Sequence, residues 1–200
     1  GFALASDVSV IPITSKIEDN FALPSIHEFE KKINNKTKAI LLCNPCNPTG
    51  YVYSKEEIIN IANLAKKNDL FIVVDEVYRE FIYTNTKHFS ILEDEKFSEN
   101  AILIDSTSKR YSLCGARVGF IVSKNSEFIK TCLKFALARL SPPTLALIAA
   151  NHALNSREDY IENVIKEYYK RREVIINELS QIDNIKFSNP MGAFYSIIKL

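Results

Sequence analysis

Residues 39–75 read AILLCNPCNPTGYVYSKEEIINIANLAKKNDLFIVVD and decide the fold class. The runs Ala39–Cys43 and Leu70–Asp75 are short, apolar and rich in branched side chains, which is typical of buried strands. Between them, Ser54 and Glu57 have the spacing of a capping box at the start of a helix. The apolar residues of this helix share one face: Ile58, Ile61, Ala62 and Ala65. Strand, helix and strand in this order predict two parallel strands joined by a crossover helix.

The same alternation continues on both sides of this unit. Further strands are predicted over Val8–Ile13, Ala101–Asp105 and Val118–Val122, and a second capping box is predicted from Ser25 to Glu28. The connection from Asp105 to Val118 is too short for a crossover helix, so we expect the last strand to run antiparallel. The predicted fold class is therefore α/β, with a mostly parallel sheet sandwiched by helices.

The second half of the chain has a different character. Two helices are predicted over Glu127–Ala138 and Thr144–Leu154, and a longer one from about residue 157 to residue 180. One stripe of the long helix carries its apolar residues: Ile161, Val164, Ile165, Tyr168, Ile175 and Leu179. Two strands follow, at Ile185–Ser188 and Ala193–Leu200. We therefore predict part of a large domain over 1–155, an interdomain helix over 156–180, and the beginning of a small α+β domain over 181–200.

Composition excludes several classes of function. The chain has 200 residues, 46% of them hydrophobic and 24% charged, with a formal net charge of +1 and no basic run. Nucleic acid and anionic membranes are therefore not expected as partners. No apolar stretch approaches the roughly 20 residues of a membrane helix. Cys43 and Cys46 have C-x-x-C spacing but no second pair of ligands, so we expect no metal site and interpret the cysteines as reduced thiols of a cytoplasmic protein.

Two polar segments follow predicted strands, where open parallel sheets place their sites. Asn44–Gly50 contains two prolines and a glycine, which predict a rigid loop that holds the amide of Asn47 as a donor. An ordinary turn is the alternative. Asp75 ends an almost wholly apolar strand, so its carboxylate is either paired or functional. A helix cap is the alternative at that position.

A third polar segment, Asp105–Arg110, also follows a predicted strand. Its serines and the guanidinium of Arg117 predict a site for an anion such as phosphate. Gly115 and Gly119 would let the backbone pass close by. A solvated basic turn is the alternative, and the absence of a P-loop pattern argues against a nucleoside triphosphate.

Together these segments resemble a known family. N-P-x-N-P-T-G at 44–50, D-E-V-Y at 75–78 and S-x-S-K at 106–109, with an arginine eight residues after the lysine, resemble the class I and II aminotransferases. These are the fold-type-I enzymes that use pyridoxal 5'-phosphate (PLP). The resemblance runs from Gly1 to Leu200, and it implies the PLP-binding large domain of that fold over 1–155.

The resemblance implies a role for each matching residue. Lys109 would form the Schiff base with the cofactor aldehyde and then carry the proton between the substrate Cα and the cofactor C4′. Asp75 would pair with the pyridinium nitrogen and keep it protonated.

The remaining matches imply contacts with the rest of the cofactor. Tyr78 and Asn47 would hydrogen-bond the phenolic oxygen of the ring. Ser106 and Arg117 would hold the phosphate, with Ser108 as a further helper.

Finer resemblance concerns the substrate. Ser108–Arg117 and Ala138–Thr144 are similar to bacterial aspartate aminotransferases, and Gly192–Tyr195 is similar to the opening of the family's small domain. The resemblance implies a homodimer that transfers an amino group from an amino acid, aspartate, to a 2-oxo acid, 2-oxoglutarate. Arg139 would bind the distal carboxylate of the substrate in the neighbouring subunit, and a surface arginine is the alternative.

Some features of the family are missing from the chain. Its early phosphate-binding glycine loop, its ring-stacking aromatic and its later carboxylate-binding arginine have no match, so we expect this chain to be a central portion of a longer protein. Two alternatives remain for the function. One is a lyase, or an aminotransferase for other substrates, on the same fold; the other is the aminotransferase-like sensor domain of a transcription regulator.

Overall fold

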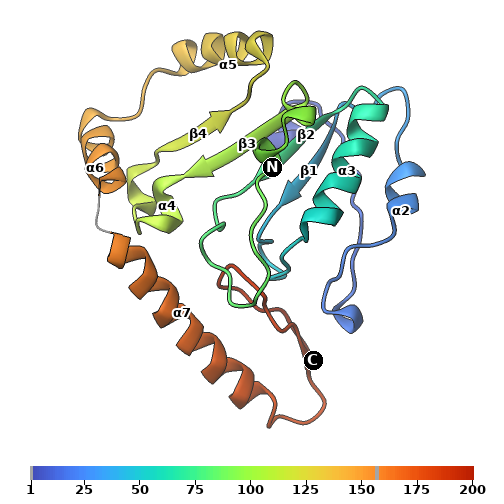
Figure 1. Cartoon of the computed structure of the whole chain (residues 1–200), viewed down its shortest axis with the longest axis vertical. Helices are drawn as coiled ribbons and strands as arrows, with labels where there is room; N and C mark the ends of the chain where they lie inside the picture. The colour runs from blue at the N-terminus through green and yellow to red at the C-terminus, as the bar shows by residue number, and fades with distance from the viewer. Residues whose placement is uncertain (1, 156–157) are drawn as a thin grey trace.

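The computed structural model describes residues 2–155 and 158–200, which form a four-stranded sheet with helices around it (Figure 1). The strand order is β1-β2-β3-β4. The first three strands are parallel, and β4 runs antiparallel to β3 as predicted. The strands are β1 (Ala39–Cys43), β2 (Phe71–Asp75), β3 (Ala101–Ser106) and β4 (Gly119–Val122). The predicted α/β fold with a mostly parallel sheet is confirmed.

The register of the sheet brings the carboxyl ends of the parallel strands together. Cys43 is the partner of Asp75 across β1 and β2, and Asp75 is the partner of Ile104 across β2 and β3. Only the short helix α4 (Thr107–Arg110) and one 3-10 turn separate β3 from β4. The three polar segments that follow β1, β2 and β3 therefore emerge at one edge of the sheet.

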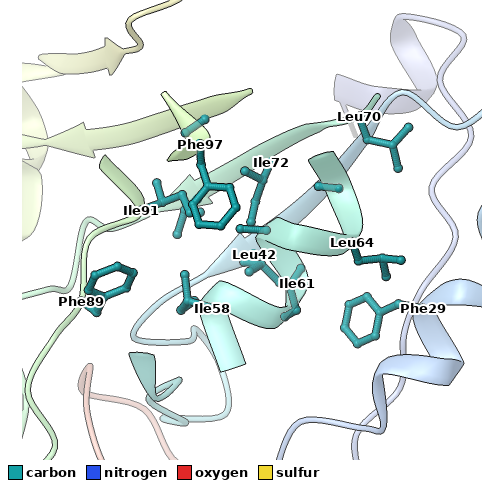
Figure 2. Close-up of a cluster of buried hydrophobic side chains, with 14 residues drawn as sticks. Phe29, Leu42, Ile58, Ile61, Leu64, Leu70, Ile72, Phe89, Ile91 and Phe97 are labelled. Carbon is teal, nitrogen blue, oxygen red and sulfur yellow. The ribbon is translucent and has the colours of Figure 1, made fainter. Parts of the chain in front are cut away.

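Helix α3 (Lys55–Lys67) joins β1 to β2, and its start is the predicted capping box. Ser54 Oγ accepts from Glu57 N at 3.2 Å, and Glu57 Oε2 accepts from Ser54 N at 2.7 Å. The predicted apolar face is buried against the sheet, where it forms the main core with Phe29, Phe89 and Phe97 (Figure 2). Burial of each side chain of this size contributes about 1.5–3 kcal/mol to the stability of the fold. The apolar face of α3 therefore stabilises the sheet at whose edge the polar segments emerge.

Two predictions near the amino terminus are wrong. Val8–Ile13 is not a strand: no described residue pairs with it, and its side chains include the exposed Val8, Val10 and Ile11. A strand needs a partner ladder, which apolar composition does not supply. Ser25 caps α2 (Ile26–Glu30), but Glu28 pairs with Lys31 at 2.7 Å instead of closing a capping box. The remaining amino-terminal elements are α1 (Phe2–Ala5) and the 3-10 turn Ile17–Asp19.

The predicted helices of the second half are present. They are α5 (Ser126–Arg139), α6 (Thr144–Leu154) and α7 (Glu158–Leu179), and the predicted start of the last one near residue 157 lies outside the described residues. Five residues of the predicted apolar stripe of α7 are half-buried, whereas Ile175 is 50% exposed. None of the described helices has the length and hydropathy needed to cross a lipid bilayer.

The carboxyl-terminal segment forms a separate two-stranded sheet of β5 (Lys186–Phe187) and β6 (Ile198–Lys199). Both strands are shorter than predicted. The second does not begin at Ala193, because this residue has a positive φ of 56° and donates its N–H to Phe81 O instead of a partner strand. The chain returns from α7 to lie beside the loops below the main sheet (Figure 1). The division into domains stays a prediction.

Candidate active site

Asp75 lies at the carboxyl end of β2 with an incompletely compensated charge. Its Oδ1 accepts from Val77 N at 3.1 Å, and no cation among the described residues pairs with it. Burial raises the pKa of Asp75, and the nearby Asp105 and Glu76 raise it further. A cationic or hydrogen-bonding ligand at this carboxylate would relieve that penalty.

Lys109 and Tyr78 come from different strand ends and meet in space. Lys109 Nζ lies 5.6 Å from the ring centroid of Tyr78 and 5.6 Å from that of Phe194. No acid among the described residues forms an ion pair with Lys109. The structure therefore brings the predicted lysine and tyrosine together and leaves the amine without a carboxylate partner.

Tyr78 is buried and its hydroxyl is part of a short contact. Its Oη lies 2.6 Å from Tyr195 Oη. Burial raises the pKa of Tyr78 and the bond to Tyr195 adds to the rise, while a hydrogen bond from the Asn47 side chain opposes it. Tyr78 is therefore a neutral phenol. Its oxygen forms hydrogen bonds with two neighbouring side chains, those of Tyr195 and of the predicted site residue Asn47.

The loop that carries Asn47 is held from several sides. Asn44 is fully buried, and its Oδ1 accepts from Tyr53 N at 3.0 Å. Gly50 has a φ of 73°, and a Cβ there would lie 2.3 Å from Pro190 Cβ. The Asn44-Pro45 and Asn47-Pro48 peptides are both cis. This rigid loop supports the interpretation that Asn47 is a stationary donor.

Cys43 does not behave as half of a C-x-x-C site. Its Sγ donates to Pro45 O at 3.3 Å and lies 3.5 Å from the N–H of Asn47. Burial raises the pKa of Cys43 to about 12, so the group is a thiol and not a thiolate at neutral pH. All four cysteines of the chain are free.

Ser106 and Ser108 form the turn that leads into α4. Ser106 Oγ accepts from Ser108 N at 3.0 Å and lies 2.7 Å from Ser108 Oγ. The exposed side chain of Arg117 turns away from them, and its Nη1 donates to Cys114 O at 2.9 Å. The structure thus brings the two serines together, and the guanidinium of Arg117 contacts neither of them.

The glycines near this turn differ from each other. A Cβ at Gly119 would lie 3.2 Å from Asp105 O, so the predicted close approach of the backbone occurs there. At Gly115 no atom lies within 4 Å of such a Cβ, so the same prediction is wrong for Gly115. Arg139 is exposed at the end of α5 and forms no hydrogen bond or ion pair with another described residue.

Sequence reasoning missed the role of Glu76, which is fully buried beside Asp75. Its carboxylate accepts from Ser90 Oγ at 3.0 Å and from Ile91 N at 3.1 Å, and it lies 3.0 Å from His88 Nε2. Ile72 and Val74 are buried on the same face of the strand, so the period-two alternation was a signal for its burial. Glu76 anchors the following loop, which leaves Asp75 as the acid available to a ligand.

Comparisons with known proteins identify the family of the chain and relatives of the same fold. The family model described as aminotransferase class I and II matches residues 3–200. An aspartate aminotransferase of Bacillus sp. (strain YM-2) is 36% identical over 194 residues, which are 96% of this chain and 49% of that protein.

Two solved structures share the fold. An aspartate aminotransferase of Thermotoga maritima has a TM-score of 0.85 at 29% identity, covering 95% of this chain and 49% of its own. An alanine aminotransferase of Pyrococcus furiosus has a TM-score of 0.81 at 33% identity, covering 92% of this chain and 48% of its own. The chain thus spans about half the length of the relatives it matches.

Proposed function

Since this chain belongs to the aminotransferase class I and II family, a family of PLP-dependent enzymes, we propose that the whole protein is an aminotransferase. It transfers the amino group of aspartate to 2-oxoglutarate. The observation that carries the proposal is the approach of Lys109 Nζ to the ring of Tyr78, 5.6 Å from its centroid, at the edge of the sheet where β2 ends in Asp75.

The side chains at this edge fit PLP group by group. The cofactor offers an aldehyde, a ring nitrogen, a phenolic oxygen and a phosphate. The chain offers an amine without an acidic partner at Lys109 and a half-buried carboxylate with a raised pKa at Asp75. The adjacent hydroxyls of Ser106 and Ser108 add donors suited to phosphate.

In the proposed reaction each side chain has one task. When bound, PLP supplies an aromatic ring that accepts electrons from the substrate Cα. Lys109 would hold the cofactor covalently through Nζ, and the same nitrogen would then carry a proton. Asp75 would keep the proton on the ring nitrogen, because its negative charge favours the cationic form.

The other residues orient the cofactor. Tyr78 and Asn47 would donate to its phenolic oxygen, and the Asn47 side chain already reaches the hydroxyl of Tyr78. Ser106 and Ser108 would bind the phosphate. Arg117 would join them once its guanidinium releases Cys114 O.

The choice of aspartate has narrower support. The name of the Bacillus relative favours it, whereas the name of the Pyrococcus furiosus structure is that of an alanine aminotransferase. We assign the selection of the dicarboxylate to Arg139.

We also propose that the protein is cytoplasmic, in keeping with its four free cysteines. We further propose that it is a homodimer. The exposed apolar side chains on α5 and α6 support this, and they include Leu133, Phe135, Leu137, Leu145 and Ile148.

A product assay of the whole protein tests the proposal. With PLP, aspartate and 2-oxoglutarate, the protein should form glutamate and oxaloacetate in equal amounts. In a parallel assay with a thioether amino acid in place of aspartate, release of pyruvate, ammonia and a thiol would identify a carbon–sulfur lyase. Absence of any amino-acid turnover, with no retained PLP, would contradict the proposal and favour a regulatory sensor domain.

A further inference from the structure

Two arginines and two carboxylates form a closed ring of ion pairs next to the candidate site. Arg79 Nη2 and Arg110 Nη2 each lie 3.0 Å from Asp105 Oδ2. Arg79 Nε lies 3.2 Å and Arg110 Nε 2.6 Å from Glu80 Oε1. Each arginine therefore bridges both carboxylates, and each carboxylate binds both arginines. We call these four residues the ion ring.

The ion ring is charge-balanced and partly shielded from water. Its inner side is shielded, because the side chains of Asp105 and Arg110 are 9% and 10% exposed, whereas those of Glu80 and Arg79 are 21% and 31% exposed. Burial works to lower the pKa of Arg110, but the charges of Glu80 and Asp105 outweigh it and raise that pKa. Asp105 Oδ1 also accepts from Ser106 N at 2.7 Å. Arg110 therefore stays charged within the ring, and Asp105 bonds the ring to the backbone of the serine turn.

The place of the ring in the chain is specific. Arg79 directly follows Tyr78, and Arg110 directly follows Lys109. Asp105 lies at the other end of the turn that carries the lysine. The ring thus ties the segment that carries the phenol to the segment that carries the amine, and the amine lies 5.6 Å from the centroid of the phenol ring.

A gain in stability is a weak explanation for the presence of such a ring. Removing four charges from water costs free energy, and well-packed apolar residues at such sites are often equally stable or more stable. Unlike apolar contacts, two of the four contacts are directional hydrogen bonds, from Arg79 Nε to Glu80 Oε1 and from Arg110 Nη2 to Asp105 Oδ2. The planar guanidinium donates such bonds only within a narrow range of geometries. The effect of the ring is therefore to fix the relative position of the two segments.

We propose that Arg79, Glu80, Asp105 and Arg110 are positioning residues that hold the Lys109 amine and the Tyr78 hydroxyl in register for transamination. The proposal rests on the proposed function. None of the four needs to touch the cofactor or the substrate, because they act through the residues next to them in the chain.

The test compares three variants of the whole protein. Arg110→Lys keeps the positive charge but loses the fork that reaches both carboxylates. Glu80→Gln keeps the shape of the side chain but weakens the ring. It is the variant to be tested if Arg110→Lys fails to fold. Arg171→Lys is the matched control, because Arg171 is exposed on α7 and pairs with a single carboxylate, Glu167, at 2.9 Å.

Three kinds of measurement are made. The first is the melting temperature of the apoprotein, and the second is the rate at which the visible absorbance band of the bound cofactor forms when PLP is added to the apoprotein, here called the recovery rate. The third is the steady-state kinetics, which give kcat and KM. For Arg110→Lys we expect kcat and the recovery rate to fall about 10-fold or more while KM stays within about threefold, because misplacement acts on chemistry more than on binding. Glu80→Gln should shift both rates in the same direction, and Arg171→Lys should match the parent.

The outcomes separate this proposal from the proposed function. If the folded ring variants keep both rates at the level of Arg171→Lys, or raise only KM, the positioning role is wrong and the aminotransferase function stands. If both rates fall only as much as the fraction of folded protein falls, the ring serves only to stabilise the fold. That result would also overturn the positioning role. A parent protein that neither retains PLP nor turns over amino acids would overturn both proposals.

Discussion

The hydroxyl of Tyr78 lies 2.6 Å from the hydroxyl of Tyr195, although the two residues are 117 positions apart in the chain. Tyr78 follows β2 of the main sheet, whereas Tyr195 precedes β6 of the small sheet. The ring of Phe194 packs against both, with its centroid 5.1 Å from that of Tyr78 and 5.1 Å from that of Tyr195. The carboxyl-terminal segment therefore takes part in the candidate site through its own hydroxyl.

We predict that Tyr195→Phe lowers kcat by about 2- to 12-fold, the scale of one net hydrogen bond, because the Tyr78 hydroxyl loses a fixed neighbour. The ring of Phe retains the aromatic contacts, so folding should be unchanged. The matched control is Tyr169→Phe on the exposed side of α7. Steady-state kinetics that are equal for both variants would remove Tyr195 from the site.

Asp75→Asn should separate function from stability. The amide cannot hold a proton on the ring nitrogen, so we expect kcat to fall by roughly 10²-fold or more. The oxygen of the amide can still accept from Val77 N, so the fold should be kept. An activity within a factor of two of the parent would contradict the role of Asp75.

The same variant should make the apoprotein more stable at neutral pH. The pKa of Asp75 is raised in the folded state, so the folded protein favours the protonated carboxyl group. The resulting contribution to the free energy of unfolding is fully present below the pKa of the unfolded state. It is lost as the pH rises through the pKa of the folded state. Asparagine removes that loss, so we expect a melting temperature about 1–3 °C higher at pH 7 and no gain at pH 3. Asp183→Asn, at an exposed position, should show neither effect.

Cys43 should make folding sensitive to alkali. Its pKa rises from 9.0 to about 12 on burial, so stability is full below about pH 9 and falls as the pH approaches about 12. Between pH 8 and pH 11, the free energy of unfolding of the parent should drop by about 2–3 kcal/mol more than that of Cys43→Ala. Urea unfolding at both pH values measures the difference, and the exposed Cys114→Ala should behave like the parent. Equal drops for the parent and Cys43→Ala would show that the pKa of the thiol is the same in the folded and unfolded states, which would contradict the raised pKa.

Arg139→Leu tests the choice of substrate. If Arg139 binds the distal carboxylate, the variant should raise KM for aspartate by about 10-fold or more and leave alanine or aromatic donors unchanged. Arg139 is exposed and without a partner among the described residues, so its loss should not disturb the fold. An equal change for all donors would count against the assignment, and so would no change.

The strands and helices that carry the candidate site were predictable from local patterns. The core strands are short apolar runs, and Ser54 and Glu57 mark the start of α3 in the sequence itself. Val8–Ile13 has the same apolar character, but a strand also needs a partner, which a local pattern does not reveal.

The contacts between distant segments could not be predicted in the same way. Asp105 and Arg79 are 26 positions apart, and nothing in either segment indicates that they meet. The pair of Tyr78 and Tyr195 spans most of the chain. Motifs therefore identified the residues that the proposed function needs, whereas the residues that hold them in place emerged only from the folded chain.

The most direct test concerns Lys109. The whole protein is incubated with PLP, reduced with borohydride and digested, and the modified peptide is located by mass spectrometry. The account predicts one labelled lysine, Lys109, and a visible absorbance band that shifts when an amino acid is added. Lys109→Ala should lose the label and nearly all turnover. A borohydride-stable link and normal turnover in Lys109→Ala would contradict the account.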